Sequence, residues 1–279
     1  ALGKNMARTF RKINRITPSV GMDTVIAFLR FWDAQNIKAI LQGKMTGQPL
    51  GKIEPAIVPA GGLGELELKQ LMESDTEGII GFVKRCDFCP PKETWEASAR
   101  KGDFSQLIKE LDRAYFKGLA DKVRGMGKDG GTVLSLVKTE IDAKNIMLGI
   151  RARREQLPSD VLEALFLEGG FIEKRELLKL SETKSTEEAI RKLSRRYDLS
   201  EPFELYKKDR SLVHFETYLE NLVAKKGVNA LRRSMLSIGA IVGYIYLKEV
   251  EVGNIRKILA AIEFGIPEEK LKDMLVIAG

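Results

Sequence analysis

Apolar residues recur at helical spacing along most of this chain. After Gly21 they stand three or four positions apart, which places them on one helix face: Val25, Ile26, Leu29, Ile37, Ile40 and Leu41. Residues 104–124 and 214–226 show the same spacing. No segment alternates convincingly between apolar and polar positions, as a half-buried strand does. The pattern therefore predicts an all-α fold.

One helical pattern is written three times. The stretches FWDAQNIKAIL, EIDAKNIMLGI and EVEVGNIRKIL begin at Phe31, Glu140 and Glu249, so that each start lies 109 residues from the next. The same offset relates three further sets: Gly21, Gly130 and Gly239; Pro49, Pro158 and Pro267; Gly61, Gly170 and Gly279. Glycine and proline at one fixed offset indicate that a helical unit has been triplicated.

Each unit is predicted to hold a long helix followed by a short one. The long helix should stop near Gly47, Gln156 or Gly265, and the proline two residues later suits the start of a second helix. The apolar residues after the proline should form a buried face: Ile53, Ile57, Leu162, Phe166, Leu271 and Leu275. We expect Gly61 and Gly170 to cap the ends of the short helices.

The repeat divides the chain into residues 1–61, 62–170 and 171–279. A unit of 109 residues exceeds the roughly 20–50 residues of a solenoid repeat, so we expect a small domain copied in tandem. Residues 62–170 should then superpose on 171–279. Three similar units can close around a pseudo-threefold axis and leave a central opening. In this arrangement the first unit is N-terminally incomplete by 48 residues (109 minus 61).

An acid and an asparagine stand three positions apart in every copy of the repeated stretch. The pairs are Asp33 and Asn36, Asp142 and Asn145, and Glu251 and Asn254. Each pair shares a helix face with the isoleucine that follows the asparagine, so it should lie at the edge of the core. Two interpretations are open. These side chains either hydrogen-bond their neighbours and fix the packing, as buried polar groups usually do, or they line the central opening.

Two short motifs have the form of cofactor or metal sites. GMGKDG, from Gly125 to Gly130, matches a dinucleotide-binding fingerprint, but that motif follows a strand, and here a helical pattern precedes it. We expect an interhelical turn. Cys86 and Cys89 have metal-ligand spacing, yet a structural zinc site needs four ligands and the sequence has only two cysteines. We expect free thiols and no cofactor or metal. The one histidine, His214, is expected in a core or an interface.

Charge and composition narrow the classes of function. The 279 residues carry a formal charge of +7, which favours an acidic partner or an anionic surface. The densest basic cluster, Arg151, Arg153 and Arg154, should form a solvated face or meet an acidic partner. The longest apolar run, residues 237–247, is shorter than the roughly 20 residues that span a bilayer. This run therefore predicts a buried helix.

Three longer stretches resemble a known family. They read WDAQNIKAILQGK…IVPAGGL, TEIDAKNIMLGIRAR…LPSD…FLEGG and KEVEVGNIRKILAAIEFGIPEEKLKDMLV. They are similar to the C-subunit family of archaeal and bacterial A/V-type rotary ATPases, whose eukaryotic relative is the d subunit of the vacuolar ATPase. The resemblance covers nearly the whole chain. The missing N-terminal segment and the pair Cys86 and Cys89 depart from it.

The resemblance implies a non-catalytic central-stalk component with the shape of a three-lobed, all-helical funnel. Such a component is peripheral to the membrane, on its cytoplasmic face, where it sits on the rotor ring of proteolipid subunits. Its central socket receives the axle, which is made of the D and F subunits. It passes torque between ATP synthesis or hydrolysis and the transport of protons or sodium, and it takes no nucleic acid and no small-molecule substrate. The alternative is a helical nucleic-acid-binding or scaffold protein, although aromatic residues at 7% are fewer than nucleic-acid binding favours.

Overall fold

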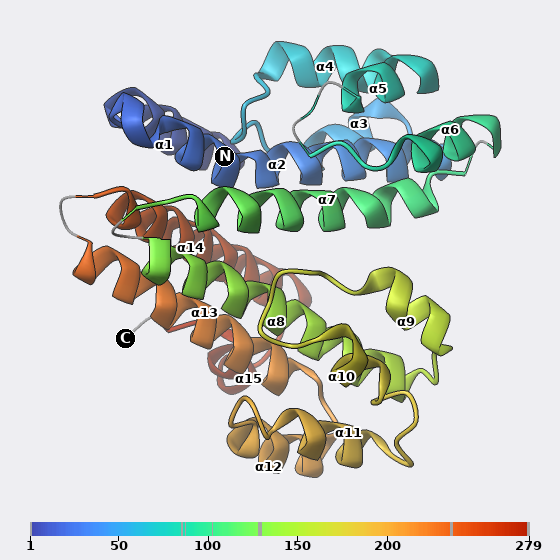
Figure 1. Ribbon diagram of the computed structural model, residues 1–279, viewed down its shortest axis with the longest axis vertical. Coiled ribbons are helices and arrows are strands. Elements are labelled where there is room, and N and C mark those ends of the chain that lie inside the picture. Colours follow the sequence, from blue (N-terminus) through green and yellow to red (C-terminus); the bar gives the residue numbers. More distant parts are fainter. Residues whose placement is uncertain are drawn as a thin grey trace. The chain divides into compact units, whose positions relative to one another are not determined.

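The chain folds into helices and connecting loops. The computed structural model describes residues 2–84, 86, 88–101, 103–127, 130–234 and 237–277. These residues contain no strand, so the predicted all-α class is confirmed. The chain divides into two compact units, Ala1–Gly127 and Lys128–Gly279. Figure 1 shows the first unit in blue to green and the second in green to red.

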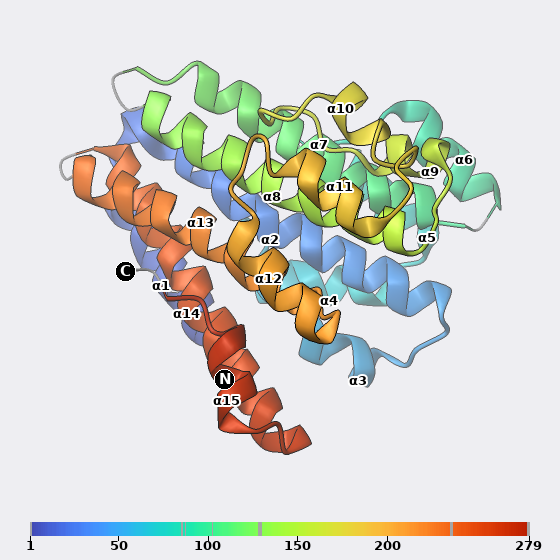
Figure 2. The same cartoon turned by 90° about the horizontal axis from the view of Figure 1, so that it is seen from below.

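The first unit is built around one pair of long helices. Its elements are α1 (Leu2–Ile16), α2 (Ser19–Met45), α3 (Leu50–Ile53), a 3-10 turn (Glu54–Ala56), α4 (Glu65–Glu73), α5 (Thr76–Val83), α6 (Lys92–Lys101) and α7 (Ser105–Arg124). α2 and α7 lie side by side in Figures 1 and 2. The Tyr115 hydroxyl donates to the Phe28 carbonyl at 3.3 Å, and the Lys38 ammonium meets the Asp112 carboxylate at 2.6 Å. α1 packs on α2, and α4 covers α2 and α3.

The second unit is built around three long helices. Its elements are α8 (Gly130–Arg154), α9 (Ser159–Leu165), α10 (Lys174–Leu178), α11 (Thr186–Leu193), α12 (Ser200–Asp209), α13 (Val213–Arg233), α14 (Ile238–Phe264) and α15 (Glu268–Met274). α13 packs along both α8 and α14. A Cβ on Gly243 would stand 2.6 Å from the Gly227 carbonyl oxygen and from the Leu231 amide nitrogen, so glycine permits the close crossing of α13 and α14.

The positions of the helices repeat along the chain. The helices α4 to α9 correspond in order to α10 to α15, and each start lies within one residue of the place that the 109-residue offset predicts. The repeat in helix order therefore extends beyond the three similar stretches of sequence. The superposition of residues 62–170 on 171–279 stays a prediction.

The compact units do not follow the predicted division into residues 1–61, 62–170 and 171–279. Their boundary falls between α7 and α8, inside the second repeat. The physical reason lies in the packing, because the long helix of one repeat packs on a helix of the next: α2 on α7, and α8 on α13. The division into repeats and the funnel arrangement remain predictions.

The long helices end where the sequence indicated. Gly47, Gln156 and Gly265 follow them with positive φ values of 63°, 52° and 63°, the left-handed conformation that turns the chain out of a helix. The prolines that come next are the N-cap residues of α3, α9 and α15, one position before the predicted first helical residue.

The short helices are buried in the first two repeats but less so in the third. Ile53, Leu162 and Phe166 are buried, whereas Ile57, Leu271 and Leu275 are half-buried. The prediction that Ile57, Leu271 and Leu275 belong to a buried face is therefore wrong. α10 packs over α8 and α9, whereas no described segment packs in the same way over α14 and α15.

Candidate functional site

The asparagine of the repeated stretch holds the loop that follows the short helix. The Asn36 side-chain amide donates to the Val58 carbonyl and accepts from the Val58 amide, both at 2.8 Å. Asn145 makes the same two hydrogen bonds to the backbone of Leu167, at 2.8 and 3.0 Å, and Asn254 makes them to Val276, at 2.8 and 3.0 Å. Each pair is 22 residues apart in sequence, so the repeated asparagine fixes the same return of the chain three times.

The aspartate of the first two repeats binds the backbone just after that loop. Asp33 accepts hydrogen bonds from the amides of Gly62 and Leu63 at 2.8 and 3.0 Å. In the second repeat Asp142 accepts them from Phe171, at 2.9 and 3.1 Å, and from Ile172, at 3.0 Å. These carboxylates join the end of one repeat to the start of the next.

The aspartates also explain the repeated glycine. A Cβ on Gly61 would stand 2.1 Å from Oδ1 of Asp33, and a Cβ on Gly170 would stand 2.1 Å from Oδ1 of Asp142. Neither glycine is next to a helix end, since α9 stops at Leu165. The prediction that they cap the short helices is wrong. They are needed because the carboxylate occupies the space of a side chain.

Burial is the main influence on the pKa values of the two aspartates of this motif. It raises the pKa of Asp33 and of Asp142 above the ordinary value of 3.8, and this effect outweighs the backbone hydrogen bonds, which lower both. The Tyr197 hydroxyl donates to Asp142 at 2.5 Å, and burial together with this carboxylate raises the pKa of Tyr197. Asp33, Asn36, Asp142 and Asn145 are thus buried packing groups, in agreement with the first interpretation.

The third repeat differs at the acid. Glu251 is exposed, and its carboxylate pairs with the Lys248 ammonium at 3.0 Å. Asn254 keeps its bonds to Val276 and is half-buried. That Glu251 or Asn254 lines a central opening stays a prediction.

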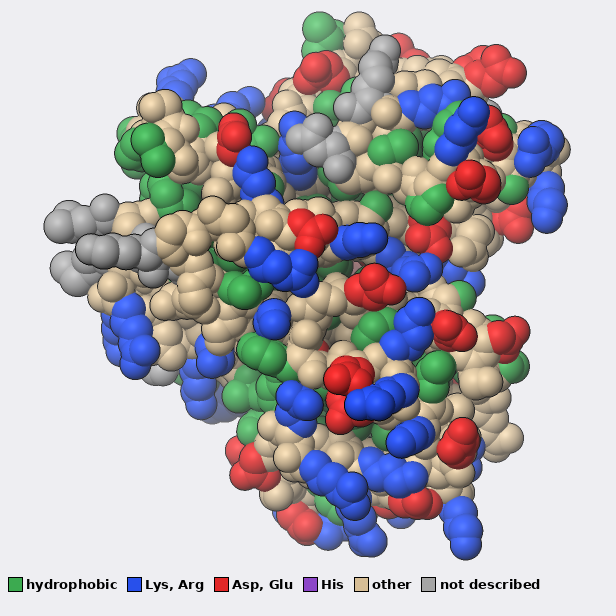
Figure 3. All heavy atoms as spheres, in the orientation of Figure 1, with side chains coloured by type: hydrophobic (Ala, Val, Ile, Leu, Met, Phe, Trp, Pro, Cys, Tyr) green, Lys and Arg blue, Asp and Glu red, His purple; other side chains and the backbone are tan. Residues whose placement is uncertain are grey.

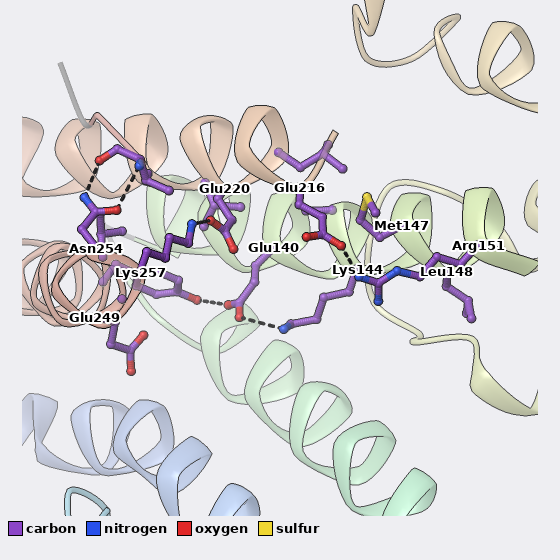
Figure 4. Close-up of a pocket in the computed structure, with 17 residues that line it drawn as sticks. Glu140, Lys144, Met147, Leu148, Arg151, Glu216, Glu220, Glu249, Asn254 and Lys257 are labelled. Atoms are coloured by element: carbon purple, nitrogen blue, oxygen red, sulfur yellow. Dashed lines mark hydrogen bonds and ion pairs between the residues drawn. The ribbon is translucent and has the colours of Figure 1, made fainter. Parts of the chain in front are cut away.

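A groove of about 620 Å³ lies between α8, α13 and α14 of the second unit. Its floor includes buried apolar side chains, Met147, Leu219 and Val276, with half-buried Val223 and Val250 beside them. Each long helix supplies one wall, and Figure 4 shows the charged side chains standing around the opening. An apolar floor between helices, inside a charged border, is the form of a groove that takes a partner helix.

The charged border is held by pairs across the groove. Arg151 of α8 pairs with Glu216 of α13, and Lys257 of α14 meets Glu220 of α13 at 2.6 Å (Figure 4). Lys144 lies 4.0 Å from Glu140 on α8, and the Tyr246 hydroxyl of α14 donates to the same carboxylate. The pairs pre-organise the walls, and their mixed signs do not form the basic surface that a nucleic-acid backbone needs.

Sequence reasoning did not select the groove acids. Glu140 and Glu249 both line it and occupy the same repeat position, 109 residues apart, where the first repeat has Phe31. The recurrence of an acid on a helix face was therefore a usable signal. The ion pairs that Arg151 and Lys257 make with Glu216 and Glu220 of α13 gave no such signal, because they depend on how the helices pack.

The predicted arginine cluster is only partly a solvated face. Arg151 and Arg154 are exposed, and Arg153 is half-buried. Arg151 belongs to the groove border, Arg153 donates to the Lys184 carbonyl at 2.8 Å, and Arg154 lies 3.4 Å from Glu155. Of these three arginines, only Arg151 lines the groove.

A second basic surface lies on α11 and α12. Figure 3 shows Lys and Arg side chains gathered over these helices. The exposed bases include Arg191, Lys192, Arg195, Arg196, Lys207, Lys208 and Arg210. Part of this charge is neutralised locally, for example by Glu187 on Arg210 and by Glu188 on Lys192 at 3.4 Å. Exposed acids, Glu201, Glu204 and Asp209 among them, also lie in this segment, so the surface is mixed in sign with a small excess of bases.

The remaining motifs are accounted for by the described residues. GMGKDG falls between the end of α7 at Arg124 and the start of α8, so the interhelical turn is confirmed, although Lys128 and Asp129 lie outside the described residues. Cys86 and Cys89 are half-buried, and their thiols donate to the carbonyls of Phe82 at 3.6 Å and of Pro90 at 3.3 Å; that both thiols stay unbridged is still a prediction. His214 is half-buried at the start of α13, 2.8 Å from Asp209.

Two other kinds of feature are absent from the part of the chain that the structure describes. No group of three or more His, Cys, Asp or Glu side chains there could hold a metal ion. No described helix combines the length and the apolar character that crossing a membrane requires.

Comparison with known proteins places this all-helical repeat in a family. The sequence profile described as "ATP synthase (C/AC39) subunit" matches residues 1–274. The chain therefore belongs to the C/AC39 family of ATP synthase subunits, as the resemblance indicated.

Individual relatives agree with the family match. The C subunit of the A-type ATP synthase of Methanococcoides burtonii is 30% identical over 99% of this chain and 77% of its own length. The proteins of the same name from Thermoplasma acidophilum and Methanosarcina barkeri are 24% and 27% identical, each over 99% of this chain and over 81% and 76% of their own lengths.

Proposed function

We propose that this chain is a non-catalytic connector in the central stalk of an A-type ATP synthase. It would join the D and F subunits of the axle to the proteolipid ring at the cytoplasmic face of the membrane, and so couple ATP synthesis or hydrolysis to proton or sodium transport. The observation that carries the proposal is the family match over residues 1–274, together with relatives named as the C subunit of A-type ATP synthases.

The use of the polar groups supports a connector. The carboxylates of Asp33 and Asp142 accept hydrogen bonds from backbone amides. The groove acids pair with neighbouring cations or accept from a hydroxyl: Glu140, Glu216 and Glu220. These groups stiffen the helices and the loops between them. A part that transmits torque needs such stiffness and complementary surfaces more than it needs a reactive group.

The groove supports a contact with the axle. Its floor offers apolar area to a helix, and its paired border offers few uncompensated charges, so the contact should depend on shape. The basic surface on α11 and α12 supports a second contact, with acidic groups, that salt would weaken because exposed charges are screened beyond roughly 10 Å at 0.1 M ionic strength.

The groove contact can be tested by charge insertion. Val250→Glu and Val223→Glu would place a carboxylate on the half-buried floor. We expect each to weaken binding of a purified D/F pair at least about tenfold, or about 1.4 kcal/mol, because a carboxylate would be desolvated at the contact. Leu66→Glu on α4, at a residue 70% exposed, is the matched control and should bind as wild type. Unchanged binding by both groove variants would contradict this contact.

A further inference from the structure

A polar pocket lies between the first turns of α8 and the last turns of α13, which run side by side in Figures 1 and 2. Its volume is about 310 Å³, and it shares no lining residue with the groove. α8 supplies two half-buried hydroxyls, those of Thr132 and Ser135. α13 supplies three exposed polar side chains: Lys226, Asn229 and Arg233. The volume is at the lower end of the roughly 300–1,000 Å³ that small-molecule pockets span.

Every described side chain that lines this pocket can donate a hydrogen bond, and two of them are cations. The Lys226 ammonium donates to the Ser135 hydroxyl at 3.2 Å, so a charge from α13 stands against the wall formed by α8. Arg233 follows seven residues later, on the same face of α13. No carboxylate lines the pocket among the residues that the structure describes. The pocket therefore offers donors and positive charge on both sides, which suits an oxyanion.

The first unit shows the equivalent place with its charge balanced by the chain itself. A hollow of about 270 Å³ lies between α2 and α7, the repeat equivalents of α8 and α13. Asp23 of α2 pairs there with Lys122 of α7 at 3.2 Å. One turn away, Asp121 pairs with Arg124 within α7. Carboxylates of the chain therefore hold both of these bases.

The second unit keeps bases at this place but lacks the acids. Both acids are replaced by uncharged residues, one base is replaced by leucine and two bases are kept, at an offset of 109 residues: Asp23 to Thr132, Asp121 to Ala230, Lys122 to Leu231, Lys117 to Lys226 and Arg124 to Arg233. In the part of the chain that the structure describes, neither Lys226 nor Arg233 forms an ion pair. Their charge is therefore open to an anion that binds from outside.

We infer that this pocket binds a phosphate group. The Arg233 guanidinium matches two phosphate oxygens with its fork of donors, and the Lys226 ammonium adds a second charge. The hydroxyls of Thr132 and Ser135 and the Asn229 amide donate to the remaining oxygens. A phosphate fits this set better than a carboxylate does, because it presents more oxygens and more charge to the five donors. The inference depends neither on the connector role nor on the partner of the groove.

Inorganic phosphate is the first probe. The full chain, isotope-labelled for NMR, is titrated with sodium phosphate and separately with sodium chloride at the same pH and ionic strength. We expect the amide signals of residues 130–135 and 226–233 to shift saturably with phosphate and to stay in place with chloride. General screening by salt would move them equally in both titrations.

Neutral variants of the two cations test the site. Arg233→Gln and Lys226→Gln should each weaken phosphate binding at least about tenfold, because each removes a charge-assisted hydrogen bond. Lys208→Gln is the matched control, because it removes the same charge from an exposed side chain of α12. It should leave the affinity for phosphate as in wild type.

Thr132→Asp restores the acid that the first unit has at this place. The new carboxylate should abolish phosphate binding, because it pairs with the cations and repels the ligand. Thr132→Asn is the neutral control and should keep most of the affinity. Both variants should melt as wild type does, since the first unit carries Asp23 at the same position of its own helix pair.

Vesicles identify the molecule that carries the phosphate. Co-sedimentation is measured with phosphatidylcholine vesicles that contain or lack phosphatidic acid. Binding that needs phosphatidic acid and is lost in Arg233→Gln and Thr132→Asp assigns a lipid headgroup. Phosphate binding in solution without such vesicle binding assigns a soluble phosphorylated ligand.

Two results would overturn the inference. The first is the absence of saturable shifts with phosphate, together with vesicle binding that is absent or that these variants leave unchanged. The second is phosphate binding that Thr132→Asp leaves intact, or that Lys208→Gln weakens as much as Arg233→Gln does. In that case the net charge of the chain, and not the pocket, would attract the anion.

Discussion

At the scale of single residues, a buried carboxylate fixes the loop after the short helix in each of the first two repeats. It lies against a glycine, Gly61 or Gly170, in space that a side chain there would need. Oδ1 of Asp142 stands 2.1 Å from the place of a Cβ on Gly170 and accepts hydrogen bonds from the Phe171 and Ile172 amides. The Tyr197 hydroxyl donates to Oδ2 of the same carboxylate. Gly170, Asp142 and Asn145 therefore act together as one structural motif, which is called a device below. This device fixes the turn between the short helix and the next repeat.

Gly170→Ala tests the steric part of this device. The added Cβ would stand 2.1 Å from the Asp142 oxygen, so the carboxylate must move and we expect a loss of about 1–3 kcal/mol in unfolding free energy. Gly253→Ala on α14 is the control, because nothing lies within 4 Å of its Cβ. It should be neutral or stabilising, by up to about 1 kcal/mol. Equal effects of the two changes in urea unfolding would contradict the account.

Asp142→Asn tests the electrostatic part. Because burial raises the folded-state pKa of Asp142 above 3.8, the folded state holds the proton more tightly than the unfolded state. The stability from this group is fully present below about 3.8 and is lost as pH rises through the folded-state pKa. We therefore expect the unfolding free energy of wild type, minus that of Asp142→Asn, to fall as pH rises from about 3 toward 7. A difference that grows with pH would mean that the pKa is lowered instead.

At the scale of elements, one helical hairpin has different surroundings in each repeat. α2–α3 and α8–α9 are covered by α4 and α10, whereas the described residues provide no such cover for α14–α15. Periodicity predicted the helices and their ends well, since turn glycines and prolines act locally. It could not predict the burial of Leu271, because identical patterns are core or surface according to what packs on them.

A pair of truncations measures this difference. Leu162→Ala removes a fully buried side chain of α9 and should cost about 2–5 kcal/mol. Leu271→Ala, at the equivalent half-buried place on α15, should cost less than about 2 kcal/mol because part of the side chain is already in water. Urea unfolding followed by a probe in the second unit reports both. Equal costs would show that α15 is as well covered as α9.

At the scale of the whole molecule, the sequence carried more about function than the geometry did. The repeated stretches indicated the family, and the profile match to residues 1–274 confirms it. The groove between α8, α13 and α14 could not be predicted, because its border joins residues such as Arg151 and Glu216 that are 65 positions apart. The basic face of α11 and α12 likewise depends on how two short helices turn.

The connector proposal makes a prediction for the assembled machine. A complete A-type ATP synthase is reconstituted in sealed vesicles with and without this protein, and ATP hydrolysis and ATP-driven ion pumping are measured in the same sample. Wild-type protein added back is the control for reversible loss. We expect that omission abolishes pumping while hydrolysis by the catalytic head continues, because torque no longer reaches the ring. Pumping that persists at full rate without the connector would contradict the central claim.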